Sequence, residues 1–405
     1  MIRKSIFFLL VPYLVFADSI ELGIDRFFKE GYAIALDGKR VGLITNQTGV
    51  DGSLRSTVKL FVKEKNFQVT ALFAPEHGLD GKIYAGIEVK NGATKEIPIF
   101  SLHGSTRRPT EDMLKTIDVL VFDIQDIGIR PYTFASTLYY AMEEAALRSI
   151  PVIVLDRPNP MGGLMVDGPM LEDKFRSFIG YINVPYCHGM TIGELAGFFN
   201  SEYKIGCKLT VVPMKGWKRD MIFKDTGLAW IPTSPNIPES DTPYFCATTG
   251  LLGELDLVNI GIGYTLPFKI VGATWINAEQ FAAALNEQKI PGASFSPIHY
   301  KPFYGSLKDK DCHGIKIHIT NHALYRPLLT QFFIIGLLKS LYPDQVTAKL
   351  KTLTKEKQDL FNKAHGSDSA YNLLLTEKFV TWKLIGHHIE ERAAFIQKRE
   401  KYLLY

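Results

Sequence analysis

Residues 71–79 read "ALFAPEHGL", an apolar run that stops at Pro75 and then presents Glu76 and His77 before Gly78. The apolar residues are typical of a buried strand, and the proline ends its hydrogen-bond ladder. The glycine permits a tight turn, so the acid and the imidazole are held at the end of the strand. The stretch therefore predicts a strand over 68–73 whose carboxyl end carries reactive side chains.

Apolar runs of this kind alternate with amphipathic helical stretches through the first half of the chain, which is typical of a parallel sheet wrapped by helices. The predicted strands are 40–45, 68–73, 97–101, 118–123, 151–156 and 208–213. The predicted helices between them are 54–65, 110–117, 132–148 and 192–203. We therefore predict an α/β fold: a Rossmann-like, mostly parallel sheet domain that binds no nucleotide.

The second half of the chain has a different composition. Proline, tryptophan and glycine become frequent between Trp230 and Tyr264, and short strands (268–275, 314–320) and a helix-rich tail follow. This change predicts a second, smaller α+β domain that completes a cleft with the first. The boundary is expected near residue 230, giving domains over 18–230 and 231–405.

The N-terminal residues have the pattern of a secretory signal peptide. A short basic start (2–4) precedes an apolar run (5–16) that ends in small residues suited to signal peptidase. We predict a signal peptide over 1–17 and an exported chain, periplasmic or secreted; the alternative is an uncut membrane anchor. No later segment is apolar for long enough to span a bilayer, so no stable membrane insertion is expected after cleavage.

The composition of the 405-residue chain, 46% hydrophobic and 22% charged, is ordinary for a globular protein. Its net charge of +4 is small and spread out, which argues against a nucleic-acid partner. The four cysteines lie far apart without CxxC spacing, which argues against a zinc site and leaves one disulfide open. The sequence leaves the oligomeric state open.

Polar side chains follow five of the predicted strands in succession. Ligands of open α/β sheets bind in the crevice beyond the carboxyl ends of the strands, so these side chains are expected to line one cleft. The stretches are Asn46-Gln47-Thr48-Gly49, Pro75-Glu76-His77-Gly78, His103-Gly104, Gln125-Asp126-Ile127-Gly128 with Arg130 and Tyr132 beyond, and Asp156-Arg157-Pro158-Asn159-Pro160.

Glu76 is the candidate general acid. A carboxylic acid held against Phe73, Ala74 and Leu79 is expected to have a raised pKa, as general acids require. The alternatives are a solvated loop glutamate or one paired with a nearby arginine.

Other chemistries lack their motifs. The chain has no GxGxxG turn after the first strand, no GxxxxGK[ST], no GxSxG and no HExxH. Asp123, Asp126 and His77 could hold a metal, but their spacing does not favour it, so neither a metal nor a cofactor is expected. Acid–base chemistry by carboxylates remains, with arginines and asparagines as substrate holders, and glycoside hydrolysis uses that equipment.

The chain also resembles a known family along nearly the whole predicted mature chain. The stretches that carry the resemblance are, in order, "VGLITNQTGV", "LFAPEHGLDG", "DIQDIGIRPYT", "LDRPNPMGG", "HGMTIGELA", "IPTSPNIP", "GYTLPFKIVGATW", "CHGIKIHIT", "YRPLLT" and "REKYLLY". They are similar to the DUF1343 family, the NamZ-type exo-β-N-acetylmuramidases of glycoside hydrolase family 171. The resemblance implies a Rossmann-like domain without nucleotide, a smaller second domain, and a cleft between them.

The resemblance further implies release of N-acetylmuramic acid from the non-reducing end of peptidoglycan fragments, so the expected partner is a peptidoglycan-derived sugar. It points to Glu76 as the acid, with His77 and Asp126 also catalytic. The residues expected to bind substrate are Asn46, Gln47, Arg130, Tyr132, Asp156, Arg157, Asn159, His188, Asn236 and Tyr264. One departure is Ile262, since many members carry an arginine between the glycines at 261 and 263.

The substrate has groups that these residues suit. The lactyl carboxylate of N-acetylmuramic acid calls for an arginine, and Arg130 and Arg157 are the candidates on the predicted rim. The acetamido group can attack the anomeric carbon in place of a protein nucleophile, which leaves retention or inversion open. Tyr132, Tyr181 and Tyr264 could stack on sugar faces, although core tyrosines are common.

Two other functions remain open from the sequence. A periplasmic muropeptide- or glycan-binding protein would keep the cleft without turnover, and Ile262 in place of arginine favours it weakly. An amidase or esterase would need a nucleophile–base pair or a metal, and the motifs show neither.

Overall fold

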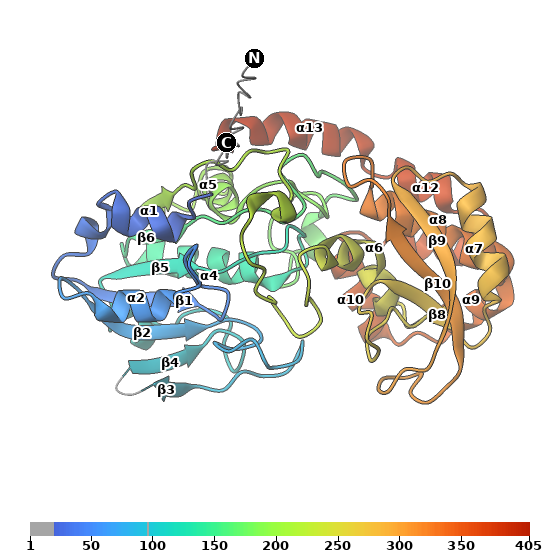
Figure 1. Ribbon diagram of the computed structural model, residues 1–405, viewed down its shortest axis with the longest axis horizontal. Coiled ribbons are helices and arrows are strands. Elements are labelled where there is room, and N and C mark those ends of the chain that lie inside the picture. The colour runs from blue at the N-terminus through green and yellow to red at the C-terminus, as the bar shows by residue number, and fades with distance from the viewer. Residues whose placement is uncertain (1–19, 95–96) are drawn as a thin grey trace, which may run out of the picture.

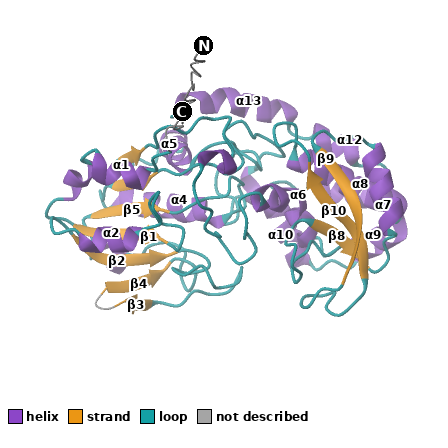
Figure 2. Ribbon diagram, in the orientation of Figure 1, coloured by secondary structure: helices purple, strands orange, loops and turns teal. Residues whose placement is uncertain are grey.

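The computed structural model describes residues 20–94 and 97–405, so the predicted signal peptide lies outside the described residues. Two lobes lie side by side in Figure 1, one built on a large sheet and the other on helices around a small sheet. Loops that connect the first sheet's strands and helices lie between the two lobes (Figure 2). Among the described residues, no helix combines the length and the apolar character needed to cross a membrane.

The first lobe is a seven-stranded sheet in the order β3-β4-β2-β1-β5-β6-β7. All neighbouring strands pair in parallel except β3, which pairs antiparallel with β4. The strands are β1 Arg40–Thr45, β2 Gln68–Ala74, β3 Gly92–Thr94, β4 Ile97–Ser101, β5 Val119–Asp123, β6 Val152–Leu155 and β7 Leu209–Val212. The predicted α/β class and all six predicted strands of this sheet are confirmed; β3 was not predicted.

Alternate residues of the central strands enter two separate cores, which explains why these strands are apolar almost throughout. On β5, Val119 and Val121 belong to one core, whereas Leu120 and Phe122 belong to the other. The first core contains side chains of α1 and α2, and the second contains those of α4 and α5. The first-lobe helices are α1 Gly23–Lys29, α2 Thr57–Lys63, α3 Glu111–Leu114, α4 Thr133–Leu147 and α5 Ile192–Glu202. Short 3₁₀ helices are η1 Tyr32–Leu36, η2 Asp173–Phe175 and η3 Phe223–Thr226.

The second lobe contains an antiparallel sheet in the order β8-β10-β9 and a helical layer. Its strands are β8 Ile270–Ala273, β9 Ala293–Tyr300 and β10 Cys312–Ile319. Its helices are α6 Thr242–Glu254, α7 Ala278–Glu287, α8 Pro327–Leu341, α9 Pro343–Lys351, α10 Lys355–His365, α11 Ser369–Thr376 and α12 Thr381–Gly386. The predicted smaller α+β domain is therefore present; its boundary near residue 230 stays a prediction.

The C-terminal segment returns to the first lobe. Helix α13 (Ile389–Arg399), followed by η4 (Glu400–Tyr402), runs from the second lobe toward α5 in Figure 1. Phe395 packs on Phe198 of α5 with ring centroids 5.8 Å apart, and the Tyr405 hydroxyl donates to Asp156 Oδ2 at 2.7 Å. The two lobes are thus joined by the tail as well as by the chain that links them.

Candidate active site

The carboxyl edge of the large sheet gathers the predicted site residues. His103 follows β4, Glu76 follows β2, Asn46 follows β1 and Asp126 follows β5, and these four strands are neighbours in that order. Because neighbouring strands are about 4.8 Å apart, the ends of β2 and β5, which Glu76 and Asp126 follow, stand roughly 10 Å apart on either side of the end of β1. The prediction that Glu76 and Asp126 share one edge is confirmed.

Glu76 is held by two hydrogen-bond donors in a largely buried position. The residue is buried (8% exposed), as the apolar run before it predicts. Thr133 Oγ1 donates to Glu76 Oε2 at 2.6 Å, and the Gly86 N–H donates to Oε1 at 2.9 Å. Thr133 is the first residue of α4, so the partial positive end of that helix also faces the carboxylate.

The turn after Glu76 depends on residues with left-handed backbone conformations. His77 has φ 70° and Gly78 has φ 79°, which reverses the chain directly after the acid. His77 Nδ1 lies 2.7 Å from the Ile83 carbonyl, so this nitrogen carries the proton and donates it. His77 thereby fixes the loop that brings Gly86 back to Glu76, and acts as a positioning residue in this structure.

His103 is the closest ionisable neighbour of Glu76. Its Nε2 lies 3.5 Å from Glu76 Oε1, and its Nδ1 is buried without a partner among the described residues. Burial lowers the pKa of His103 in spite of the Glu76 carboxylate, so the imidazole is uncharged at neutral pH. The sequence places His103 after a strand but gives no local sign that it contacts Glu76.

The predicted rise in the pKa of Glu76 is wrong for the free protein. Burial does raise this pKa, but His103, the Thr133 hydroxyl, the Gly86 N–H and His77 together lower it below its ordinary value. The apolar neighbours of Glu76 are visible in the sequence, whereas its donors come from other loops. Glu76 is therefore ionised at neutral pH before any ligand binds.

Three more side chains at this edge have polar atoms without partners among the described residues: Asp126 Oδ1, Asn46 Nδ2 and Gln47 Oε1. Asp126 Oδ2 accepts from the Gly128 N–H at 2.8 Å, and burial raises the pKa of Asp126 to about 7. A buried polar atom without a hydrogen bond is costly, so these atoms are suited to bind a ligand.

The loop that joins the two lobes closes over this edge. Gln47 Nε2 donates to the Pro232 carbonyl at 2.7 Å, and the Tyr132 hydroxyl donates to Thr233 Oγ1 at 2.8 Å. Tyr132 is thus fixed by this loop, and its ring packs on Phe134. Asn236 lies in the same loop and is half-buried.

Neither Arg130 nor Arg157, the two arginines predicted to bind the lactyl carboxylate, has a guanidinium edge free for it. Arg130 is buried and donates to the carbonyls of Pro169, Val184, Ala364 and His365 at 2.7–3.2 Å. Arg157 forms a two-point ion pair with Asp123 at 2.6 and 2.9 Å. A cavity beside Arg157 has a volume of about 20 Å³, enough for one water and not for a sugar. This geometry argues against the predicted clamp by either arginine.

Three other predicted binding residues stabilise the fold at the same edge. Asp156 accepts from Thr191 Oγ1, the Gly193 N–H and the Tyr405 hydroxyl, which anchors α5 and the C-terminal tail. Asn159 bonds to the backbone of Met161 and Met190. His188 accepts from the Met190 N–H, and burial lowers its pKa to about 3, so it stays uncharged.

Tyr264 and Tyr181 pack away from Glu76. Tyr264 lies in the second lobe against Tyr300, with ring centroids 5.1 Å apart, beside the small sheet. Tyr181 donates to Glu143 at 2.9 Å and packs on Tyr140. No hydrogen bond or ring contact of the described residues joins either one to Glu76 or Asp126, so a core role accounts for both.

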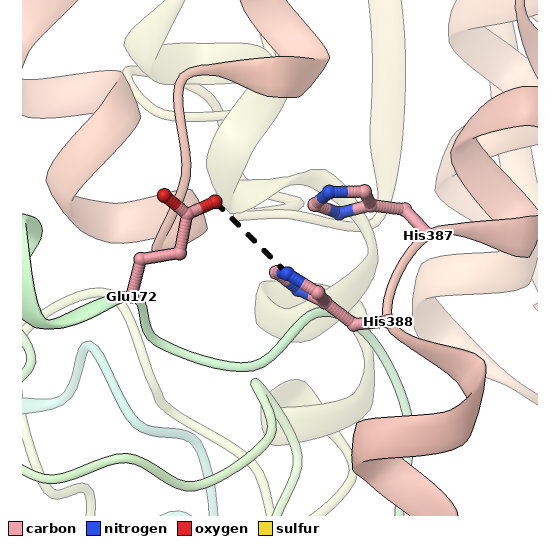
Figure 3. Close-up of side chains that lie close together, drawn as sticks. All are labelled: Glu172, His387 and His388. Carbon is pink, nitrogen blue, oxygen red and sulfur yellow. Dashed lines mark ion pairs between the residues drawn. The ribbon is translucent and has the colours of Figure 1, made fainter.

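One cluster of metal-ligand residues lies where the tail meets the first lobe: Glu172, His387 and His388 (Figure 3). His388 Nε2 lies 4.0 Å from Glu172 Oε1, while His388 Nδ1 accepts from the Met170 N–H at 3.2 Å. An acceptor at Nδ1 puts the proton of the neutral ring on Nε2, so Nε2 has no lone pair for a metal. The cluster therefore fits a hydrogen-bonded contact better than a metal centre.

Comparisons with known proteins agree with this architecture. Family models described as exo-β-N-acetylmuramidase NamZ, N-terminal and C-terminal, match residues 41–241 and 245–405. The chain is 42% identical over 327 residues to the peptidoglycan β-N-acetylmuramidase NamZ of Bacillus subtilis (strain 168), covering 80% of this chain and 78% of that protein.

Two solved structures share the fold. One is a DUF1343 family protein from Bacteroides fragilis NCTC 9343 with a TM-score of 0.90 and 41% identity, covering 96% of this chain and 99% of that one. A second DUF1343 family protein from the same organism has a TM-score of 0.69 and 27% identity, with the same coverage. The fold, the buried acid and these matches define an enzyme of the glycoside hydrolase class. The chain belongs to the NamZ family of exo-β-N-acetylmuramidases.

Proposed function

We propose that this enzyme removes N-acetylmuramic acid from the non-reducing end of peptidoglycan fragments, with Glu76 as the general acid. The observation that carries the proposal is the setting of Glu76: a buried carboxyl at the ligand-binding edge of the sheet, with His103 Nε2 3.5 Å from it. The Bacillus subtilis relative is a peptidoglycan β-N-acetylmuramidase, which supports the substrate.

An acid of this kind has to gain a proton when substrate binds. Glu76 is ionised in the free protein because its neighbours lower its pKa. A bound sugar excludes water from the carboxyl and brings the negative charge of the lactyl group, and both changes raise the pKa of a carboxylic acid. Glu76 then takes up one proton and gives it to the leaving oxygen as the glycosidic bond breaks.

Asp126 is suited to a different step. The acetamido oxygen of the sugar can attack the anomeric carbon, and the attack is aided by a group that accepts the acetamide proton. Asp126 Oδ1 is buried and has no partner among the described residues, so it can accept that N–H. The strands that lead to Asp126 and Glu76 are two spacings apart, roughly 10 Å, which is wide enough for a sugar ring between the two loops.

A binding protein without turnover is the alternative, and one assay separates it from an enzyme. The purified chain is mixed with a chromogenic aryl β-N-acetylmuramide, and release of the aryl alcohol is followed with time. We expect many turnovers per protein molecule. Saturable binding of the glycoside with no release of alcohol would identify a binding protein instead.

A further inference from the structure

Two adjacent arginines after β4, Arg107 and Arg108, are held in opposite ways. Arg108 is anchored, since its Nη1 donates to Glu143 Oε2 at 2.6 Å and its Nη2 donates to the Tyr181 hydroxyl at 3.1 Å. Arg107 is exposed, and its guanidinium has no hydrogen bond or ion pair with any of the described residues. One arginine of the pair thus fixes the loop and the other is presented to solvent.

A continuous row of side chains connects Arg107 to the acid. The guanidinium carbon of Arg107 lies 4.8 Å from the centroid of the Phe178 ring. The Phe178 ring lies 5.8 Å from the His103 ring, and His103 Nε2 lies 3.5 Å from Glu76 Oε1. The Arg107 charge also acts on His103, where it adds to burial in lowering the pKa. Arg107 is therefore a cation at the rim of the Glu76 site.

The contact with Phe178 makes this guanidinium suited to an anion. A planar guanidinium stacked on an aromatic ring keeps its N–H edge free, and that edge matches a carboxylate with two parallel hydrogen bonds. Stacking also restricts the long side chain before a ligand arrives, so less entropy is lost on binding. Arg130 and Arg157 have no such free edge, because both terminal nitrogens of Arg130 donate to carbonyls and the Nε–Nη2 edge of Arg157 is paired with Asp123.

We propose that Arg107 binds the lactyl carboxylate of the N-acetylmuramic acid unit whose glycosidic bond lies at Glu76. The assignment rests on the proposed function and names the residue that selects this sugar. It has a consequence for peptidoglycan fragments: a lactyl group joined to a stem peptide is an amide without charge. Arg107 would therefore favour units from which the peptide has been removed.

The test compares two aryl muramides that differ only at the lactyl group, one with the free carboxylate and one with the neutral carboxamide. For the parent enzyme we expect kcat/KM to be about 10- to 100-fold higher for the carboxylate, as for loss of a charged hydrogen bond. Arg107→Ala should lower kcat/KM for the carboxylate by a similar factor and leave the carboxamide unchanged. Arg107→Lys should restore part of the preference, since it keeps the charge without the two-point geometry.

Arg40→Ala is the matched control, because Arg40 is an exposed arginine at the opposite edge of the same sheet. It should keep the full preference for the carboxylate. An equal rate of the parent on both glycosides would overturn the role of Arg107, as would an unchanged preference in folded Arg107→Ala. If the parent cleaves neither glycoside, the proposed function itself fails, and this inference with it. If the parent cleaves both at equal rates, only the role of Arg107 fails.

Discussion

We expect Glu76→Gln to lower the rate on the natural disaccharide by roughly 10²–10⁴, the usual contribution of a general acid. Glutamine keeps the shape of the side chain and can still accept from Thr133 Oγ1, so substrate binding should survive. The loss should shrink for an aryl glycoside with an activated leaving group, because such a group departs with little protonation. The measurement is kcat and KM of the parent and the variant on both substrates.

The pH dependence of kcat/KM is a second test of Glu76 as the acid. A general acid must be protonated, and kcat/KM reports the free enzyme, in which the pKa of Glu76 lies below its ordinary value. For the natural disaccharide, kcat/KM should therefore rise as the pH is lowered from about 8 to about 5, and Glu76→Gln should abolish this rise. Glu88→Gln, in the same loop but exposed, is the control and should behave as the parent. A near-normal rate of Glu76→Gln on the disaccharide would end the assignment of Glu76 as the acid.

The second large effect is expected on stability, from Arg130→Met. Arg130 bonds to four backbone carbonyls, two in the first lobe and two at the end of α10 in the second. Replacing Arg130 leaves these buried carbonyls without donors, which destabilises the fold. Part of this loss is offset, because burial of the charged guanidinium is itself unfavourable and lowers the pKa of Arg130 to about 10. We expect a net loss of about 3 kcal/mol.

Thermal unfolding measures this loss. Arg130→Met should lower the Tm by roughly 5 °C or more, whereas Arg40→Met, at an exposed ion pair, should change it by about 1 °C or less. A substrate clamp would give the opposite pattern: an unchanged Tm and a large rise in KM that is absent for the carboxamide substrate. That result would restore Arg130 to the binding site.

The central strands of the large sheet were predictable because they are buried on both faces, whereas the missed edge strand β3 is exposed. A strand such as Val119–Asp123 supplies side chains to two cores, so it is apolar throughout and is readily recognised. The missed strand Ala293–Tyr300 is at the edge of the small sheet, buries only Phe295 and Tyr300 and contains Pro297. Its sequence therefore has no continuous apolar run, and it resembles a loop.

The edge that carries the site was also predictable, whereas the roles of its residues were not. The position after a parallel strand places Glu76, Asp126, Arg130 and Asp156 at one rim whatever their partners are. Their roles depend on groups far away in the sequence: Thr133 for Glu76, His365 for Arg130 and Tyr405 for Asp156. No local pattern reports such contacts, so structural arginines and substrate-binding arginines look alike in the sequence.

The most direct test of the central claim is which end of a peptidoglycan chain the enzyme attacks. Two sets of short glycan chains without stem peptides are prepared, one ending at the non-reducing side in N-acetylmuramic acid and the other in N-acetylglucosamine. Products are followed with time by mass spectrometry. The proposal predicts that free N-acetylmuramic acid is the first product from the first set and that the second set stays intact. Internal cleavage of either set, or release of N-acetylglucosamine from the second, would contradict it.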